Sequence, residues 1–384
     1  MKLTSLFKDF FESEKASGLV LLVCTVVSLL LANSSFSESY FSLLHYSFAG
    51  STITHWINEG LMTIFFLLIG LELERELYNG ELSNKQNALL PLAGAIGGMI
   101  VPACVYLFFN IGTPLQSGAG IPMATDIAFA LGILSLVGNR VPASLKIFLA
   151  ALAVIDDLGA IIVISVFYTA TIAWLYLLAV LLIWGLLFVL NRLKVHNLIP
   201  YIIGGIAMWY CMLHSGVHAS IAGVILAFVI PFGTGAEKST SYILQKGLHK
   251  PVAFFILPLF ALANTAIIIS ANPLQIFTEH YSLGILLGLV IGKAVGIFCF
   301  CMLAIKLGIC TLPKELKNIH IVGAGFLGGI GFTMSVFITM LAFNDNVVVN
   351  NAKLVIIFSS FIAGLIGFVI LKLALRKSVI KKRR

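Results

Sequence analysis

Apolar segments long enough to cross a lipid bilayer follow one another along almost the whole chain. A membrane-spanning helix needs about 20 apolar residues, because each residue adds about 1.5 Å to its length and the hydrocarbon layer is about 30 Å thick. Of the 384 residues, 60% are hydrophobic and only 10% are charged, whereas about a quarter of the residues in a soluble domain are charged. We therefore expect one all-α polytopic membrane domain over 1–384 and no domain outside the membrane.

Polar residues and Gly/Pro clusters divide the apolar sequence into about twelve predicted transmembrane spans. Their approximate limits are 17–33, 57–73, 88–109, 116–137, 145–169, 172–190, 198–212, 217–231, 251–271, 282–305, 319–343 and 352–371. We expect a core bundle over about 88–169 and 282–371, which would hold the functional site. The remaining spans, over about 17–73 and 172–271, would form a panel beside it.

Lysine and arginine are confined to one side of this predicted topology. All but three of the 24 basic residues lie in the terminal segments or in alternate loops, and the loops between these contain none. Because cytoplasmic loops collect Lys and Arg, we expect both termini in the cytoplasm and an even number of spans. The same topology explains the formal net charge of +8, so no nucleic-acid partner is expected. Lys146 and Lys353 lie near span ends, where a long side chain reaches the interface, and Lys293 lies near the middle of a span.

Four ionisable residues lie at similar depth inside the predicted spans: Asp126, Asp156, Asp157 and Lys293. An ionisable group at the centre of a bilayer costs several kcal/mol, which makes it a candidate functional residue. Three carboxylates against one ammonium leave an excess of negative charge. A medium of low dielectric constant tolerates that excess only when protons or bound cations neutralise it. The set predicts a site that exchanges protons and cations, and the alternative is a structural ion pair that holds helices together.

The residue types around the acids favour a small, hard cation such as Na⁺ or Li⁺. These ions take oxygen ligands from carboxylates, hydroxyls and carbonyls. Thr125 contributes a hydroxyl beside Asp126, although a membrane threonine often bonds its own helix backbone. Asp156 and Asp157 are neighbours on one helix and point about 100° apart, so we expect one to bind the ion while the other is paired. The six cysteines form no CxxC pair, so neither a zinc site nor any cofactor is expected.

Two predicted spans, the fourth and the eleventh, contain glycine and proline where an ordinary helix would not. The fourth contains GAGIPMATDIAFALG (118–132) and the eleventh contains GAGFLGGIGFTMS (323–335). Unwound backbone at mid-membrane is tolerated only where protein buries it or where it lines a cavity, and close helix packing through small residues is the alternative. Each of these two discontinuous spans is the second member of a triplet, spans three to five and ten to twelve, and the triplets begin on opposite sides of the membrane. This is the layout of an inverted repeat, in which Asp126 would offset the positive helix ends and Lys293 the negative ones.

Six motifs of this chain resemble those of the NhaA family of bacterial sodium/proton antiporters. They are ATDIAFALG (124–132), LAVIDDLGAI (152–161), SGVHASIAGV (215–224), LPLFALANT (257–265), IGKAVGI (291–297) and GFLGGIGFTMS (325–335). The resemblance extends over nearly the whole chain. It implies a transporter of the bacterial inner membrane, and not an enzyme, that exports Na⁺ or Li⁺ in exchange for protons. It also implies two protons per sodium ion and an activity that rises at alkaline pH.

The resemblance implies roles for individual residues of the buried set. Asp156 and Asp157 would form the ion-binding centre, with Asp157 as the foremost cation ligand. Asp156 would exchange contact with Lys293, and Asp126 and Thr125 would lie at the break in the fourth span.

Other regions of the resemblance concern ion access, pH response and assembly. GLELERE, at 70–76, matches a segment near the cytoplasmic entrance and would place Glu72, Arg75 and Glu76 there. His218 matches a histidine that the family links to pH response, although a lone histidine among apolar residues more often only packs. The external loop 34–56 would form a hairpin that pairs two protomers. The expected partners are therefore Na⁺, Li⁺, protons, membrane lipid and a second copy of the chain.

Three other functions fit parts of the same pattern. A sodium-coupled symporter of an organic solute on a related inverted-repeat fold would need a cavity lined by polar and aromatic side chains, and few such residues lie near the acids. An intramembrane aspartyl protease also needs two aspartates, but its GxGD motif does not occur in the sequence. A channel would need rings of charge or of carbonyl groups, which one asymmetric cluster of acids does not supply. Antiport is therefore the main prediction, with symport as the alternative.

Overall fold

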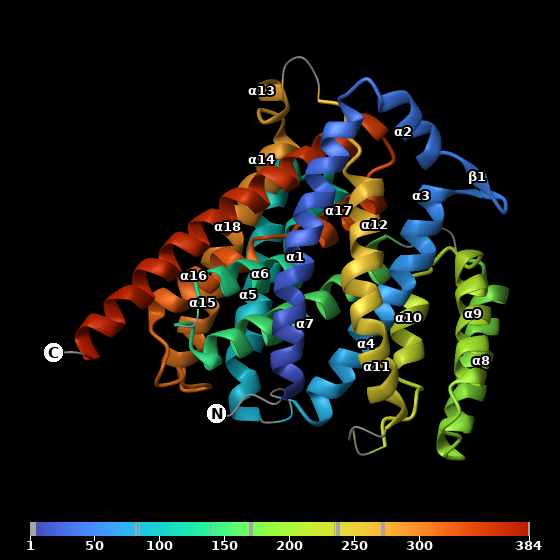
Figure 1. Ribbon diagram of the computed structural model, residues 1–384, viewed down its shortest axis with the longest axis horizontal. Helices are drawn as coiled ribbons and strands as arrows, with labels where there is room; N and C mark the ends of the chain where they lie inside the picture. The colour runs from blue at the N-terminus through green and yellow to red at the C-terminus, as the bar shows by residue number, and fades with distance from the viewer. Residues whose placement is uncertain are drawn as a thin grey trace.

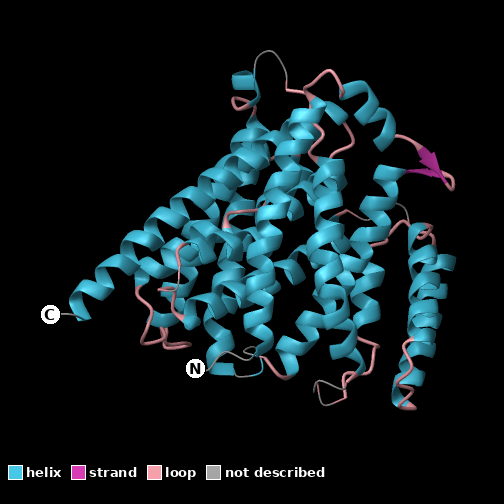
Figure 2. Ribbon diagram, viewed as in Figure 1, coloured by secondary structure: helices cyan, strands magenta, loops and turns pink. Residues whose placement is uncertain are grey.

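The computed structural model describes residues 5–80, 83, 85–138, 140–168, 172–233, 235, 239–269 and 273–382. These residues are almost wholly helical, with one short hairpin of two strands (Figure 2). The strands β1 (Ser47–Phe48) and β2 (Ser51–Thr52) are antiparallel and pair Ser47 with Thr52 and Phe48 with Ser51.

The helices follow in an order that matches the apolar segments of the sequence. The first half contains α1 (Ser5–Ala32), α2 (Ser37–Leu44), α3 (Ile53–His55), α4 (Met62–Tyr78), α5 (Lys85–Asn110), α6 (Ile127–Leu136), α7 (Ala143–Phe167), α8 (Trp174–Arg192) and α9 (Ile199–Leu213). The second half contains α10 (Ile221–Ala227), α11 (Thr240–Pro251), α12 (Leu257–Asn264), α13 (Pro273–Ile276), α14 (His280–Leu287), α15 (Lys293–Lys306), α16 (Asn318–Gly328), α17 (Phe332–Ala342) and α18 (Asn346–Lys382). A 3₁₀ helix, η3 (Gln116–Met123), precedes α6, and three π-helical turns continue other helices: η1 (Trp56–Leu61), η4 (Val252–Ile256) and η5 (Gly288–Gly292).

The lengths and compositions of these helices are those of a multi-pass membrane protein. Among the described residues, eight continuous helical segments are long and apolar enough to cross a bilayer, and the number rises to ten if each of two bent pairs is one crossing. The bent pairs are α1 with α2, at 117°, and α16 with α17, at 47°. Each of the twelve predicted segments contains helix, but α9 and α10 have only 15 and 7 residues. The all-α polytopic class is thus confirmed, and the count of twelve crossings stays a prediction.

The ninth predicted span begins earlier than expected. The predicted loop between the eighth and ninth spans, 232–250, contains Lys238, Lys246 and Lys250, yet α11 already begins within it at Thr240. Proline removes a backbone donor and clashes with the preceding turn of a regular helix. Here Pro251 is followed directly by the π-helical turn η4, whose wider turn changes the hydrogen-bond register, and the helix therefore continues through the proline.

Figure 1 shows how the long helices are arranged. The start of α1, the far end of α18 and the connections α8 to α9 and α15 to α16 lie in the lower part of the view, whereas α2 and the hairpin lie at the top. In the interior, α5 packs along α15 and α7, and α16 packs between α15 and α18. The pair α8 and α9 stands at the edge of the bundle, and only 11% of the apolar stretch of α8 is buried inside the protein.

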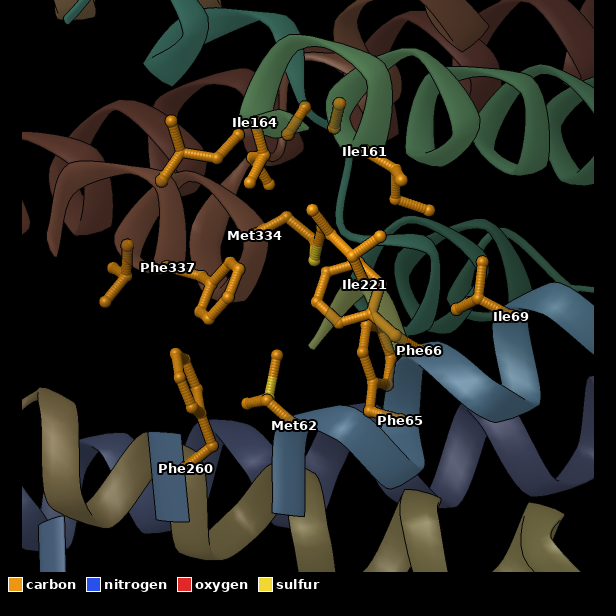
Figure 3. Packing of buried hydrophobic residues seen from close by; sticks show 14 of the residues in the cluster. Met62, Phe65, Phe66, Ile69, Ile161, Ile164, Ile221, Phe260, Met334 and Phe337 are labelled. Carbon is orange, nitrogen blue, oxygen red and sulfur yellow. The ribbon is translucent and has the colours of Figure 1, made fainter. Parts of the chain in front are cut away.

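A cluster of large apolar side chains joins α4, α7, α10, α12 and α17. Figure 3 shows that the side chains of these helices converge on one region, and Met62 and Phe66 are among the most deeply buried. The ring centroids of Phe66 and Phe337 are 5.5 Å apart. We call this group the apolar cluster; its labelled members are Met62, Phe65, Phe66, Ile69, Ile161, Ile164, Ile221, Phe260, Met334 and Phe337.

Glycines allow α5 and α15 to approach each other at the level of their backbones. A Cβ atom added at Gly97 would meet the carbonyl oxygen of Gly296 and the Phe300 side chain, and a Cβ at Gly296 would meet the carbonyl oxygen of Gly97. Membrane helices commonly associate through such small residues, because apolar lipid tails supply little hydrophobic drive for helix association. The position of Lys293 relative to α5 therefore depends on this close contact.

We expect Gly97→Val to separate α5 from α15 and to destabilise the fold by about 1–3 kcal/mol, the usual cost of overpacking. The measurement is the thermal unfolding midpoint of the detergent-solubilised protein. Gly185→Val is the matched control, because a Cβ at Gly185 would meet no atom within 4 Å. Equal midpoints for the two variants would show that the glycine contact does not determine the helix spacing.

Candidate functional site

Two helical elements leave helical geometry at the same place and bond to each other there. The first element ends as η3 at Met123, continues with extended backbone at Ala124, and becomes helical again in α6. The second ends as α16 and resumes as α17. The Asp126 amide donates to the Ile330 carbonyl at 2.6 Å, and the Ser335 hydroxyl donates to the Ile121 carbonyl at 2.6 Å. Backbone groups freed by the breaks are thus satisfied within the protein, as the bilayer requires.

Asp126 lies at the N-terminal ends of both α6 and α17. As the N-cap residue of α6, it accepts a hydrogen bond from the Phe129 amide at 3.1 Å through Oδ1. Its Oδ2 accepts from the amide and the hydroxyl of Thr333, at 3.0 and 2.6 Å. A carboxylate at this position satisfies unpaired helix N–H groups and faces two partial positive charges. The Asp126 carboxylate is therefore fully occupied by structural bonds.

Lys293 and Asp156 form an ion pair that is completely buried. The Lys293 ammonium lies 2.7 Å from Asp156 Oδ2, and both side chains have no exposed surface. Lys293 also donates to the carbonyl of Met123, the last residue of η3. The ammonium therefore faces both a carboxylate and the negative end of a broken helix, which is the electrostatic arrangement that stabilises a buried cation.

Thr125 connects this ion pair to the second broken element. Its hydroxyl lies 2.7 Å from Asp156 Oδ2 and 2.8 Å from the Gly328 carbonyl oxygen. A hydroxyl has a single hydrogen, so Thr125 donates to only one of these acceptors at a time. Any change in the charge of Asp156 is therefore felt at the break between α16 and α17.

Asp157 has no such partners. Its side chain is 1% exposed, and its Oδ1 atom has no hydrogen-bond partner. The second oxygen of the neighbouring acid, Asp156 Oδ1, is also buried without a partner. A buried polar atom without a bond costs about 1–3 kcal/mol, and more if it is charged. The structure therefore leaves one carboxylate oxygen unsatisfied on each of these two neighbouring residues, and each could take a proton or a cation.

The donor set around Asp157 suits an alkali cation better than a transition metal. Within the parts of the chain that the structure describes, no group of three or more His, Cys, Asp or Glu side chains could hold a metal ion together. A hard monovalent ion needs only oxygen atoms, and carboxylates, hydroxyls, carbonyls and water all supply them. Asp157, Asp156 and Thr125 provide the side-chain oxygens at this place.

The predicted entrance residues lie near the C-terminal end of α4, which ends at Tyr78. Glu72 is buried, its side chain bonds to Gln245 of α11, and Arg75 and Glu76 act on it electrostatically. Glu72 is also close enough to Asp157 to act on its charge. The structure therefore joins the predicted entrance to the acid cluster through one long helix.

His218 is separate from the acid cluster. Its Nε2 lies 3.2 Å from Glu59 and its Nδ1 lies 2.9 Å from the Ser220 hydroxyl. The ring also packs edge-on against Phe337, with centroids 5.2 Å apart. No hydrogen bond or ion pair joins His218 to Asp157 within the described structure. Among the described contacts, the one that connects His218 to an element of the acid cluster is the packing of its ring against Phe337 of α17.

The sequence did not indicate several groups that the structure brings to the site. Thr333 was present in the glycine-rich motif of the eleventh span but was not singled out, although a hydroxyl directly after a helix break is a usable signal. Glu59, the partner of His218, is an acidic residue inside the second predicted span and was also missed. The carbonyl groups of Met123 and Gly328 contribute backbone acceptors, and no side-chain pattern reveals these.

Comparison with known proteins gives a consistent result over the full length. A family model described as Na+/H+ antiporter 1 matches residues 8–371. The Na(+)/H(+) antiporter NhaA of Flavobacterium psychrophilum is 64% identical over 383 residues, which cover 100% of both chains. The proteins of the same name from Cytophaga hutchinsonii and Vibrio campbellii are 60% and 46% identical, and the matches cover 98% and 99% of this chain and 97% and 98% of theirs. The chain therefore belongs to the Na+/H+ antiporter 1 family.

We expect Asp126→Ala to lower the free energy of unfolding by about 2–4 kcal/mol, because it removes a helix cap and leaves buried Thr333 donors unpaired. Thermal unfolding in detergent measures this effect. Glu38→Ala is a suitable control, since Glu38 is exposed on α2 and far along the chain from the breaks. If Asp126→Ala unfolds at the same temperature as the wild-type protein, the carboxylate does not hold the two breaks together.

Proposed function

We propose that this protein exchanges cytoplasmic Na⁺, or Li⁺, for external protons. The observation that carries the proposal is the Asp157 carboxylate, which is buried, has an unpartnered oxygen, and directly follows in sequence a second acid, Asp156, that also has one. Such a group is stable only when it holds a proton or a cation. The names of the relatives, all of which are sodium/proton antiporters, support the same exchange and give no support to the symporter alternative.

Coupling arises because the two substrates compete for one set of oxygens. A site that faces the cytoplasm at alkaline pH is ionised and admits Na⁺. The loaded site then turns outward, where Na⁺ leaves and protons take its place. An empty and ionised site would carry uncompensated charge through a medium of low dielectric constant, so only the filled site crosses. At acidic pH protons occupy the carboxylates and exclude Na⁺, which explains activation by alkaline pH.

The second proton of the proposed two-for-one exchange comes from the ion pair of Asp156 and Lys293. When Na⁺ draws Asp156 toward itself, Lys293 loses its counterion and can release a proton, or Asp156 itself releases one. The two groups are coupled, so the exchange belongs to the pair. Two protons per sodium ion move one net charge in each cycle, and the membrane potential then contributes about 2.3 kcal/mol per 100 mV.

The apolar cluster and Glu72 lie on different sides of Asp157 along the helices. On α4, Met62, Phe66 and Ile69 precede Glu72, and on α7, Ile161 follows Asp157. We infer that the apolar cluster seals the external side of the site, while the Glu72 side leads to the cytoplasm. Alternating access then requires repacking of the apolar cluster, and α17 contributes both Phe337 to the seal and Thr333 to the break.

The proposal includes a membrane topology and an inverted repeat. Both termini are placed in the cytoplasm of a bacterial cell, with the protein in the inner membrane and twelve crossings. The chain ends of α1 and α18 and two of the predicted basic connections lie on one side (Figure 1), which supports this orientation. The mutual bonding of the two broken elements supports a core built from spans three to five and ten to twelve, with the other spans as a panel.

We also propose that the hairpin of β1 and β2 pairs two protomers at the external surface of the lipid membrane. The hairpin exposes the rings of Tyr46 and Phe48, with 62% and 65% of their surfaces accessible. The Trp56 indole donates to the Phe48 carbonyl at 2.9 Å and fixes the hairpin to η1. A rigid, exposed aromatic edge of this kind is suited to strand pairing with a second copy.

We expect Asp157→Asn to abolish sodium-dependent proton movement. The neutral amide keeps the shape of the side chain but can neither release a proton nor balance a cation. The measurement is the fluorescence of an acridine dye in everted vesicles after addition of NaCl, LiCl or KCl. Glu38→Gln makes the same chemical change at an exposed position and should retain the response. Wild-type traces that do not depend on sodium, or an active Asp157→Asn protein, would reject the proposal.

We further expect purified protein in weakly buffered detergent solution to acidify the medium when NaCl is added, because Na⁺ displaces bound protons. Choline chloride serves as the ionic-strength control. Lys293→Ala and Asp156→Asn should each release fewer protons per bound Na⁺ than the wild-type protein, since each removes one member of the coupled pair. Sodium binding without any proton release is the result that the competition mechanism cannot accommodate.

A further inference from the structure

A second unpartnered carboxylate lies on the opposite side of α4 from the ion site. Glu74 is 5% exposed, and its Oε2 atom is buried without a hydrogen-bond partner. Glu72 and Glu74 are two residues apart, so their side chains point to nearly opposite sides of the helix. Glu72 faces α11 through Gln245, whereas Glu74 faces the segment after α10 and the end of α8. Glu74 is therefore not part of the proposed sodium entrance.

Glu74 lines a cavity of about 420 Å³ at the ends of α4 and α8. The volume is within the range that holds a small ligand or a headgroup. Besides Glu74, its wall contains four aromatic rings, one guanidinium group, two amide side chains and a glycine, from Tyr78, Asn79, Phe188, Asn191, Arg192, Phe228, Phe232 and Gly233. The rings of Tyr78 and Phe232 are 5.2 Å apart, and Arg192 lies over the Phe188 ring at 5.0 Å.

This wall contains the groups that recognise an ammonium and a phosphate together. A buried carboxylate among aromatic faces attracts an ammonium group through charge and through cation–π contact. The Arg192 guanidinium, which is exposed and held against Phe188, is suited to a phosphate group. One negative and one positive protein group match a zwitterion, and neither an anionic headgroup nor a simple metal cation uses both.

The surroundings of the cavity indicate where such a zwitterion comes from. Arg192 is the last residue of α8, and a helix end of this kind lies at the level of the lipid headgroups. The rest of α8 presents apolar side chains outward, including Leu181, Leu182, Leu186 and Val189, each more than half exposed. Acyl chains of a lipid whose headgroup entered the cavity would lie along this face. A free metabolite has no acyl chains and would not contact this face of α8.

We propose that the Glu74 cavity binds the headgroup of phosphatidylethanolamine. The primary ammonium lies against the Glu74 carboxylate beside the aromatic rings, the phosphate lies against Arg192, and the acyl chains follow α8. This site is independent of the ion-binding centre and of the proposed exchange.

Native mass spectrometry of the full-length protein in detergent, titrated with lipids, tests the proposal. We expect the wild-type protein to bind phosphatidylethanolamine about tenfold more tightly than Glu74→Gln does, the change that loss of one hydrogen bond to a charged group produces. Phosphatidylglycerol lacks the ammonium and should bind equally to both proteins. Glu38→Gln is the matched control and should bind as the wild-type protein does. Soluble phosphoethanolamine should compete only at far higher concentration, because it lacks the acyl chains.

Arg192→Gln gives an independent check on an exposed side chain that folding does not require. It should weaken binding of phosphatidylethanolamine several-fold while leaving Glu74 in place. Equal affinities of the wild-type protein, Glu74→Gln and Arg192→Gln for phosphatidylethanolamine would overturn the proposal. Tighter binding of phosphatidylglycerol by the wild-type protein would also overturn it. Soluble phosphoethanolamine that binds as tightly as the lipid would assign the cavity to a free amine instead.

Discussion

The need to satisfy every polar group inside the bilayer is the constraint on which the rest of this structure depends. Two helical elements are broken in the interior of the helix bundle, and each break frees amide and carbonyl groups that lipid cannot hydrate. Asp126 takes the amides of Phe129 and Thr333, while Lys293 takes the Met123 carbonyl. The bond from Asp126 to Ile330 joins the breaks directly. Without these partners the two elements would become continuous helices, and the pocket of oxygens between them would not exist.

The same constraint gives the three buried acids different tasks. Asp126 accepts three hydrogen bonds and is held in place by them. Asp156 has one oxygen in the ion pair with Lys293 and one oxygen free. Within the described residues Asp157 has no hydrogen bond or ion pair, and only the nearby Lys293 ammonium acts on it with opposite charge. The number of bonding partners thus falls from Asp126 to Asp156 to Asp157, although all three residues are aspartates.

The sequence predicted the helical membrane fold, and it grouped four ionisable residues that the structure also buries near one another, because apolar length and intramembrane charge can both be recognised in local composition. The family resemblance pointed to Asp157 as the foremost ligand, but the residue pattern itself left open which carboxylate would be without a partner. That depends on where the Met123 and Gly328 carbonyls and the Thr333 hydroxyl lie after two distant segments cross, which is a property of packing. The ninth span was predicted to begin too late for a similar reason. Charged residues near Lys246 suggested a loop, but the π-helical turn after Pro251 lets α11 continue through the proline.

Charge arithmetic at the site gives the charge on which the membrane potential acts in the proposed cycle. With Asp157 and Asp156 ionised and Lys293 protonated, this group carries one net negative charge, and a bound Na⁺ brings it to zero. Two bound protons in place of Na⁺ bring it to one positive charge. Asp126 is left out of this sum. Two helix N-terminal ends, each equivalent to about half a positive charge, offset its negative charge equally in the sodium-loaded and the protonated form. If Lys293 releases the second proton instead, the sodium-loaded site carries one negative charge and the protonated site is neutral, so the two forms again differ by one charge. A potential that is negative inside therefore drives the proposed cycle through this one charge, whichever member of the pair holds the second proton. A single unpartnered carboxylate beside a buried ion pair is thus enough to join chemical competition to electrical drive, with no separate pathway for either ion.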